Sequence, residues 1–331
     1  MLASVAHACP PRSYGPWEQV AWTLAEGLVD RGHEVTLFAT QDSSTRARLQ
    51  AVAPHGYEED PSVDAKVFEA LHIASVFEQA ADFDVISNQF DFLPLAFSEL
   101  VRTPVVTTIH GFSSEAILPV FQRYNATSHY VAISDADRHP TLDYAATIHH
   151  GIDLASFTEG AGDGGYLLFL GRIHPDKGTA VAIEAARLAG LPLIIAGPVQ
   201  DEEYFATEVA PWLGEPGIDY VGPVGPVERD ALLGGAIALL HLIDFDEPFG
   251  LSVVESLAAG TPVIASPRGS MPELIDDGRT GFLVSDAAGA AAAARAVTPA
   301  MRVLARASAH DRFSSARMVD DYEALFARLL H

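Results

Sequence analysis

The sequence contains few of the residues on which several classes of protein depend. Cysteine occurs once in 331 residues, as Cys9, so a single chain can form neither an internal disulfide nor a thiolate zinc site. This favours a reducing compartment, and we expect a cytoplasmic protein. Only two lysines occur, Lys66 and Lys177, and arginine supplies the other 18 of the 20 basic residues. A lysine retained in such a chain is a candidate for a specific task.

Positive charge is scarce as a whole. The 20 Lys and Arg residues oppose 44 Asp and Glu, which gives a formal net charge of −24 at pH 7. A nucleic-acid partner is therefore not expected, because clustered cations bind the phosphate backbone. Long apolar runs are also missing: residues 232–243 fall short of the ~20 residues that a membrane span needs. We expect no stable membrane insertion, and the sequence leaves the oligomeric state open.

Three catalytic motifs are absent as well. No GxGxxG follows the first apolar segment, which disfavours a nicotinamide or flavin dehydrogenase. No GxxxxGK[ST] occurs, which disfavours a P-loop phosphotransferase. A GxSxG nucleophile elbow is absent too.

What the sequence does contain is an alternation of short apolar runs with helical patterns, typical of a parallel sheet covered on both faces. We predict an α/β protein with two Rossmann-like, doubly wound domains that face a central cleft. The predicted parts are an amino-terminal domain, a glycine-containing linker, a carboxyl-terminal domain and a final helix, at residues 1–150, 151–165, 166–310 and 311–331. The predicted strands are residues 2–7, 33–39, 84–88, 104–110, 129–134, 166–172, 191–197, 218–222, 236–242 and 261–266.

The clearest candidate site residues follow the strand at 166–172. Open α/β sheets place ligands at the carboxyl ends of their strands, where Arg172 and Lys177 precede a helix. A guanidinium fork and an ammonium point charge can together clamp a diphosphate. The alternative is that both are surface residues flanking an ordinary loop, and the scarcity of lysine favours the clamp.

A second candidate is the segment DFDEPFGLSVVES, at residues 244–256. Glu247 lies in a loop and Glu255 lies eight positions later, inside a helix whose N-terminal N–H groups attract phosphate or sugar hydroxyls. Two carboxylates beside them can accept hydrogen bonds from the diols of a hexose and a ribose. The alternative makes Glu247 a capping acid and Glu255 a solvated residue. Asp244 and Asp246 also permit a divalent metal, which the Arg and Lys clamp makes unnecessary.

Two positions in the first domain complete the set. His110 ends a strand and is followed by Gly111, which lets the backbone approach a ligand. Gly15 precedes the first helix and can present its N–H to a phosphate, although Pro16 removes one donor from that turn.

Several motifs together resemble the retaining glycosyltransferases of family four, which have the GT-B fold. In the second half these are GRIHPDKG, EPFGLSVVESLAAGTPVIAS, RGSMPELI and DGRTGFLV; in the first half they are YGPWEQVAWTLAEGLVDRGHEVTLFAT, VVTTIHG and VAISDA. The resemblance covers almost the whole chain. It departs from the family pattern at Gly15-Pro16, where Gly-Gly is common, and at His149-His150-Gly151, where Pro-Asn-Gly is usual.

The resemblance implies roles for the candidate residues. Arg172 and Lys177 would neutralise the donor diphosphate, while Glu247 would bind hydroxyls of the transferred sugar. Glu255 would hold the ribose, His110 would approach the donor sugar near the reacting centre, and Gly15 would line the diphosphate side. The resemblance also places three backbone N–H groups near the donor sugar, those of Phe249, Gly250 and Leu251. The final helix would cross back to the first domain.

The implied reaction moves a hexose from a UDP-, GDP- or ADP-sugar to a hydroxyl of a soluble small-molecule or saccharide acceptor, with retention and with no cofactor or metal. The leaving diphosphate would itself help accept the nucleophile's proton. The alternatives are a sugar-nucleotide epimerase or a phosphorylase on the same scaffold, or a non-catalytic protein that binds nucleotide sugars.

Overall fold

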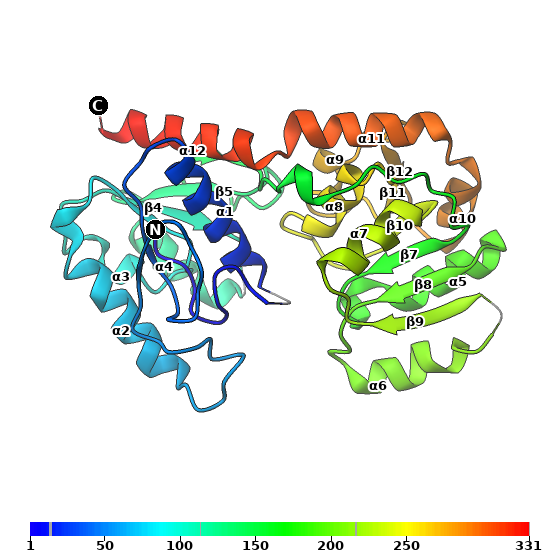
Figure 1. The fold of residues 1–331 in the computed structure, drawn as a ribbon, viewed down its shortest axis with the longest axis horizontal. Helices are drawn as coiled ribbons and strands as arrows, with labels where there is room; N and C mark the ends of the chain where they lie inside the picture. The colour runs from blue at the N-terminus through cyan, green and yellow to red at the C-terminus, as the bar shows by residue number, and fades with distance from the viewer. Residues whose placement is uncertain (13–14, 113, 216, 331) are drawn as a thin grey trace. The chain divides into compact units, whose positions relative to one another are not determined.

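The computed structural model describes residues 1–12, 15–112, 114–215 and 217–330, which form two compact units. Unit 1 comprises residues 1–152 and the carboxyl-terminal segment from Ser315 onward, and unit 2 comprises Asp153–Ser314. Each unit has its own parallel sheet, with helices packed on it (Figure 1). The prediction of an α/β protein with two parallel-sheet domains is confirmed.

Unit 1 is built on short parallel strands. They are β1 (Thr36–Phe38), β2 (Arg48–Gln50), β3 (Ile86–Asn88), β4 (Val105–Ile109), β5 (His129–Ala132) and β6 (Tyr144–Thr147). The helices are α1 (Pro16–Asp30), α2 (Ala65–Phe77), α3 (Leu95–Ser98), α4 (Leu118–Arg123) and α12 (Ser315–Leu330), with 3-10 turns η1 (Ala80–Asp82) and η2 (Glu115–Ile117). Bridges from Leu2 to Phe38 and to Asn88 join the β1–β2 pair to the β3-β4-β5-β6 sheet.

Helix α12 belongs to unit 1 although it ends the chain. Its apolar face includes Met318, Val319 and Tyr322, all buried, and it lies along α1 (Figure 1). The contact is close because Gly27 of α1 has no side chain: a Cβ there would lie 2.4 Å from Val319 Cγ2. At the rim, His33 Nε2 lies 2.9 Å from a Glu323 carboxylate oxygen.

Unit 2 has a single six-stranded parallel sheet in the order β12-β11-β10-β7-β8-β9. The strands are β7 (Leu167–Leu170), β8 (Leu193–Ala196), β9 (Ile218–Gly222), β10 (Ala238–His241), β11 (Val263–Ala265) and β12 (Gly281–Leu283). The helices are α5 (Thr179–Ala189), α6 (Glu202–Tyr204), α7 (Pro226–Gly235), α8 (Leu251–Ala258), α9 (Met271–Leu274), α10 (Ala287–Ala296) and α11 (Pro299–Arg312). Shorter helical turns are η3 (Leu154–Ser156), η4 (Pro175–Lys177), η6 (Ala210–Trp212) and the π-helical η5 (Phe205–Val209).

The strand order of unit 2 determines where a ligand can bind. From β7 the chain proceeds to β8 and β9 on one side, and from β10 it proceeds to β11 and β12 on the other. The direction of winding therefore reverses between β7 and β10. Doubly wound sheets bind ligands at this switch point, beyond the carboxyl ends of the two strands.

Of the segment predicted as a linker, residues 153–165 belong to unit 2 and residues 151–152 to unit 1. The Gly160 N–H donates to Ala259 O at 3.1 Å, and the Gly162 N–H donates to Gly234 O at 3.0 Å. Arg302 binds the Gly160 carbonyl from the other side. Gly160 permits close packing here, because a Cβ on it would lie 2.1 Å from Gly234 O.

Other element predictions need correction. The expected first strand at 2–7 forms only isolated bridges at Leu2, and strands β2, β6 and β12 were not predicted. The final helix was expected to run unbroken from residue 311. Instead, α11 ends at Arg312 and α12 begins at Ser315, because Phe313 turns into the core of unit 2 against Phe249.

Candidate active site

The loops after β7 and β10 meet at the switch point of unit 2. The β7 loop carries Arg172 and, in η4, Lys177; the β10 loop carries Glu247. Asp244 N–H donates to Asp176 O at 2.8 Å, which ties the two loops together. The parallel register of β7 and β10 thus brings together residues that lie far apart in the sequence.

Lys177 and Glu247 form the central pair of this site. Lys177 Nζ lies 2.6 Å from Glu247 Oε2, and only 14% and 16% of the two side chains are exposed. The ammonium also lies 4.4 Å from the centre of the Phe245 ring, a cation–π contact. The structure therefore brings together one of the two lysines and one of the two candidate carboxylates.

His241, at the end of β10, lies on the other side of Glu247. Its Nε2 is 3.6 Å from Glu247 Oε2, longer than a hydrogen bond. Burial by itself raises the pKa of Glu247, but His241 and the Lys177 ammonium outweigh it and lower the pKa to about 2. Glu247 is therefore a carboxylate at neutral pH and can accept hydrogen bonds from the hydroxyls of a sugar.

Two glycines let the backbone position this pair. Gly178 has φ +72°, and a Cβ there would lie 1.9 Å from the Leu242 carbonyl oxygen. Gly269 has φ +53°, and a Cβ there would lie 2.3 Å from the Glu247 carbonyl oxygen. Ser270 adds two hydrogen bonds to the same loop, from its N–H to Glu247 O at 2.9 Å and from its hydroxyl to Phe249 O at 2.6 Å.

Helix α8 begins directly after this loop. Its N-cap is Gly250, with φ +93°, and no side chain caps its first turn. Phe249 is anchored in the core, and Leu251 is the first helical residue. The N-terminus of α8 thus carries the partial positive charge of the helix dipole close to Glu247 in the chain.

Glu255 lies inside α8 and has a partner that the sequence did not indicate. Arg229 Nη1 of α7 lies 3.1 Å from Glu255 Oε1, and 13% of the Glu255 side chain is exposed. Burial raises the pKa of Glu255, and Arg229 acts in the opposite direction. The interpretation of Glu255 as a solvated helix residue is therefore wrong.

Arg172 and the two aspartates occupy the rim of the site. Arg172 Nη1 hydrogen-bonds Gln200 Oε1, after β8, and no contact to Lys177 is recorded among the described residues. Asp244 pairs with Arg268 at 2.8 Å, and Asp246 Oδ1 accepts from Gly269 N at 3.3 Å. Across the described residues, no three His, Cys, Asp or Glu side chains are arranged to hold a metal ion.

His110 lies in unit 1, where both of its ring nitrogens have partners. Nε2 is 3.0 Å from Gln89 Oε1, and Nδ1 is 3.3 Å from His150 Nε2. Because the amide oxygen of Gln89 only accepts, Nε2 carries the proton and Nδ1 accepts from His150. Burial lowers the pKa of His110 to about 3, so the ring is neutral at pH 7.

The surroundings of His110 link three elements of unit 1. Trp17 of α1 stacks on its ring at 5.5 Å between centroids. The Gln89 amide donates to Thr108 Oγ1 at 2.9 Å, and this hydroxyl lies 2.7 Å from Tyr322 Oη of α12. Gly15, the N-cap of α1, lies in the same unit as His110. It comes two residues before Trp17, which stacks on the His110 ring.

Sequence reasoning missed four residues of these sites. His241 and Gln89 each lie at the carboxyl end of a strand, so the rule that identified His110 applies to both. Arg229 and His150 carry no such signal, because only the packing of α7 on α8 and of residue 150 beside β4 brings them into contact.

Comparison with known proteins supplies the family. Residues 155–305 match the model "Glycosyl transferases group 1", and residues 17–156 match "Glycosyltransferase Family 4". A phosphatidyl-myo-inositol mannosyltransferase of Mycolicibacterium smegmatis is 30% identical over 82% of this chain and 78% of its own length. A D-inositol 3-phosphate glycosyltransferase of the same organism is 33% identical over 46% of this chain and 38% of its own length.

Solved structures show the same fold. AviGT4, a glycosyltransferase involved in avilamycin A biosynthesis, has a TM-score of 0.70 and 23% identity, over 98% of this chain and 93% of that one. Anabaena HepE in complex with UDP and glucose has a TM-score of 0.74 and 18% identity, over 95% and 96%. A sucrose-phosphate synthase of Thermosynechococcus elongatus has a TM-score of 0.79 and 18% identity, over 98% and 97%.

Proposed function

The chain belongs to glycosyltransferase family 4 and is a glycosyltransferase with the GT-B fold; we propose that it is a retaining hexosyltransferase that needs no metal. The proposed donor is a UDP-, GDP- or ADP-hexose, and the proposed acceptor is a hydroxyl of a soluble small molecule or saccharide. The UDP complexes of HepE make the uridine nucleotides the first donors to test.

The observation that carries this proposal is the Lys177–Glu247 pair at the switch point of unit 2. A diphosphate placed at the N-terminus of α8 would meet the Lys177 ammonium, and Arg172 lies five residues earlier on the same loop after β7. Glu247, held as a carboxylate, would accept hydrogen bonds from hydroxyls of the hexose. Glu255, oriented by Arg229, would do the same for the ribose.

The proposed reaction balances without a protein nucleophile. The bond from the anomeric carbon to the diphosphate oxygen breaks, and a bond to the acceptor oxygen forms on the same face of the sugar. The acceptor's proton passes to the departing diphosphate oxygen. Lys177, Arg172 and the α8 N-terminus stabilise the negative charge that develops there. Such electrostatic stabilisation of the transition state is usually the largest single contribution to catalysis.

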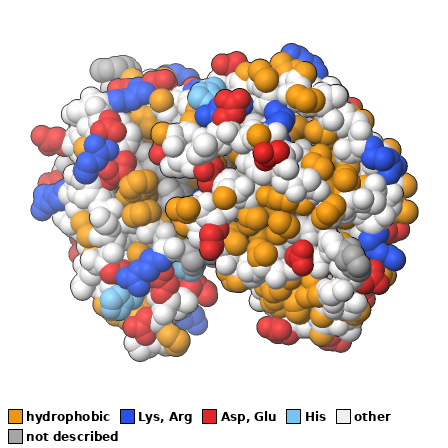
Figure 2. Space-filling view, turned by 45° about the vertical axis from the view of Figure 1, so that its right-hand side comes forward, with side chains coloured by type: hydrophobic (Ala, Val, Ile, Leu, Met, Phe, Trp, Pro, Cys, Tyr) orange, Lys and Arg blue, Asp and Glu red, His pale blue; other side chains and the backbone are white. Residues whose placement is uncertain are grey.

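The acceptor proposal rests on charge. The chain carries a formal charge of −24, and the described Lys and Arg side chains on the face drawn in Figure 2 are scattered among Asp and Glu. An anionic membrane surface attracts clustered basic residues instead. In the described part of the chain, no helix has the length and hydropathy to cross a membrane. The low cysteine content supports the cytoplasm as the proposed location of this reaction.

A two-step experiment tests the function. A thermal-shift screen with UDP, GDP, ADP and their hexoses identifies the nucleotide, since a ligand at 100 times its dissociation constant stabilises the fold by about 2.7 kcal/mol. The stabilising sugar nucleotide is then incubated with an acceptor panel, and NMR of the anomeric signal reads the linkage. We expect a glycoside with the donor's anomeric configuration, with and without EDTA.

Three other results would contradict the proposal. An epimerised nucleotide sugar or a free sugar phosphate would show an epimerase or a phosphorylase. Donor binding without turnover on any acceptor would favour a binding protein. Activity lost in EDTA and restored by Mn²⁺ would return Asp244 and Asp246 to consideration as metal ligands.

A further inference from the structure

Unit 1 contains a hollow, and none of its lining residues is among those described around His110. Its volume is about 240 Å³, and its lining consists of Arg12, Asp42, His55, Glu59 and Asp60. At ~30 Å³ per water molecule in the liquid, roughly eight waters fit, which is room for a molecule the size of a monosaccharide. The lining residues follow Leu2 and β1 in the sequence, at the sheet edge where doubly wound folds bind ligands.

Backbone hydrogen bonds hold two of the surrounding loops together. Cys9 N–H donates to the Ser43 hydroxyl at 2.9 Å, and Ser44 N–H donates to Cys9 O at 2.8 Å. The loop after Leu2 is therefore fixed to the loop after β1.

A third loop, at residues 55–60, supplies the other lining residues. Tyr57 N–H donates to Val5 O at 3.2 Å, and Glu58 N–H donates to Ala6 O at 3.1 Å. Gly56 makes this approach possible, because a Cβ there would lie 2.3 Å from the Ala6 carbonyl oxygen. These lining residues are His55, Glu59 and Asp60.

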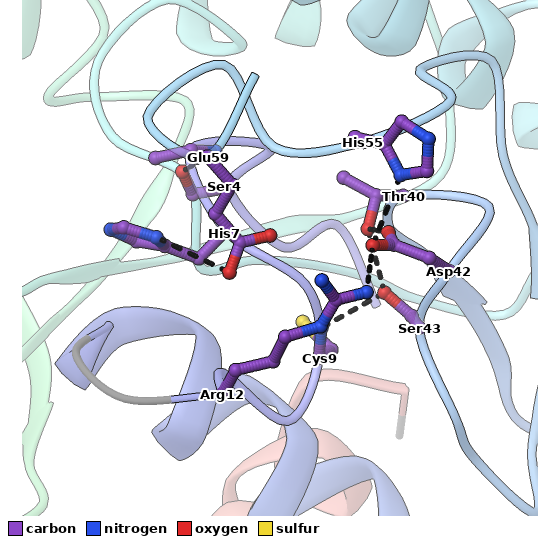
Figure 3. Close-up of polar contacts among 10 residues, drawn as sticks. Ser4, His7, Cys9, Arg12, Thr40, Asp42, Ser43, His55 and Glu59 are labelled. Atoms are coloured by element: carbon purple, nitrogen blue, oxygen red, sulfur yellow. Dashed lines mark hydrogen bonds and ion pairs between the residues drawn. The ribbon is translucent and has the colours of Figure 1, made fainter.

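Three side chains orient Asp42. Thr40 Oγ1 donates to Oδ1 at 2.7 Å, Arg12 Nη2 donates to Oδ2 at 2.8 Å, and His55 Nδ1 lies 3.2 Å from Oδ2 (Figure 3). Only 15% of the Asp42 side chain is exposed, whereas 67% of Arg12 is. Burial tends to raise the pKa of Asp42, but its hydrogen bonds from Thr40 and His55 lower it, so the group is ionised at neutral pH.

Glu59 lies across the hollow with His7 and Ser4 (Figure 3). Its Oε1 is 4.0 Å from His7 Nδ1, and its Oε2 is buried without a hydrogen-bond partner among the described residues. Because Oε2 has no exposed surface, a ligand can contact Glu59 only through the 21% of its side chain that is exposed.

The charged side chains that line the hollow favour neutral ligands over anionic ones. One guanidinium faces three carboxylates, and Arg12 is already engaged by Asp42. A phosphate entering this hollow would meet Asp42, Glu59 and Asp60, and like charges at close quarters repel. Hydroxyl groups, in contrast, can donate to these carboxylates and accept from Arg12 or His55.

We propose that this hollow binds the acceptor of the transfer reaction as an unphosphorylated polyol, a sugar or a cyclitol. The assignment rests on the proposed hexosyl transfer and deepens it, because it names the acceptor's chemical class. Two relatives carry names that specify phosphorylated or phosphatidyl acceptors, so this chain differs from them in the charge that its acceptor brings.

The test compares matched pairs of neutral and phosphorylated polyols. The full chain, saturated with the nucleoside diphosphate that stabilises it most, is titrated with glucose and glucose 6-phosphate and with myo-inositol and inositol 1-phosphate. Ligand-observed NMR reads the binding. We expect at least one neutral polyol to bind at least tenfold more tightly than its phosphate. Equal or tighter binding of the phosphates, or binding of neither class, overturns the proposal.

A variant pair locates the binding in this hollow. Glu59→Gln should weaken the neutral polyol by about ten- to a hundredfold, the effect of losing a hydrogen bond to a charged group. Glu58→Gln makes the same change at the exposed neighbouring position, outside the lining, and should leave the affinity unchanged. Equal affinities in Glu59→Gln and the natural chain would place the polyol elsewhere and overturn the assignment.

Donor binding separates this inference from the proposed function. Glu59→Gln should keep the nucleotide-dependent thermal shift of the natural chain, because Lys177, Glu247 and Glu255 are unchanged. If no nucleotide sugar binds the natural chain, the proposed function fails. If the nucleotide binds and transfer occurs but Glu59→Gln leaves the polyol affinity unchanged, only the assignment of the acceptor site fails.

Discussion

The candidate sites of the two units differ in how they handle charge. In unit 2, acidic and basic side chains are paired: Lys177 with Glu247, and Arg229 with Glu255. Around His110 in unit 1, the groups are neutral and linked by hydrogen bonds from His150 through Gln89 and Thr108 to Tyr322. A diphosphate needs positive charge to bind it. A neutral ring such as that of His110 can contact a sugar but does not compete for the diphosphate.

This difference in charge also explains why the site residues of unit 2 are easier to predict from the sequence than those of unit 1. Charges at a switch point stand out in a sequence with two lysines, and the spacing between Glu247 and Glu255 is a motif. Neutral networks consist of common residues whose partners depend on packing. The following variants test this contrast, from the largest expected effect to the smallest.

Breaking the central pair of unit 2 should have the largest effect. We expect Lys177→Ala and Glu247→Ala each to abolish measurable transfer, with kcat/KM reduced by about 10²–10³-fold or more, the scale on which a group that stabilises transition-state charge acts. Steady-state kinetics measure the loss, and circular dichroism checks that the variants stay folded. Lys66→Ala removes the other lysine, which is exposed on α2, and should leave transfer unchanged. Full activity in either pair variant would remove that residue from the site.

The neutral state of His110 should be visible in the pH dependence of stability. Burial lowers the pKa of His110 from 6.5 to about 3, and that of His72, also in unit 1, to about 4. Below pH 6.5 the unfolded chain binds protons that the folded chain does not. The free energy of unfolding therefore decreases as the pH is lowered, by up to about 1.4 kcal/mol per pH unit for each group. Replacing either histidine by Gln should therefore reduce the loss between pH 7 and pH 5 by about 2 kcal/mol.

Urea unfolding at the two pH values measures this, and activity distinguishes the two histidines. His72 binds the Ala3 carbonyl at 2.9 Å and has no proposed role, so His72→Gln should retain transfer. His110→Gln should lose it. An unchanged pH dependence in His110→Gln would show that the ring is not held neutral.

The smallest effect is expected at the ribose carboxylate. Glu255→Gln replaces the carboxyl group by an amide of the same shape, and we expect the affinity for the nucleoside diphosphate to fall by up to about tenfold, since a hydrogen bond contributes about 0.5–1.5 kcal/mol. Isothermal titration calorimetry measures it. Glu184→Gln on α5 is the matched control, because Glu184 is an exposed helical glutamate of the same unit. A loss confined to sugar transfer, with nucleotide affinity intact, would contradict the ribose role.

The sequence was sufficient for the fold class and for the residues at the switch point of unit 2, because alternation and strand-end chemistry are local patterns. It was insufficient at residues 151–165, where the glycines predicted a linker. Gly160 in this segment packs closely against Gly234, since a Cβ there would lie 2.1 Å from Gly234 O. Only the neighbours of a glycine show whether it serves a linker or a close contact.

The sequence by itself determined the types of chemical group available: a lysine kept in an arginine-rich chain, two carboxylates at a family spacing and a histidine at a strand end. Tertiary structure decided their states. It placed Lys177 against Glu247, gave Glu255 the Arg229 partner, enclosed His110 beside His150 and left Glu59 Oε2 buried without a donor among the described residues. The physical reason is that burial and neighbouring charge set protonation and hydrogen bonding, and both arise only when distant segments pack together.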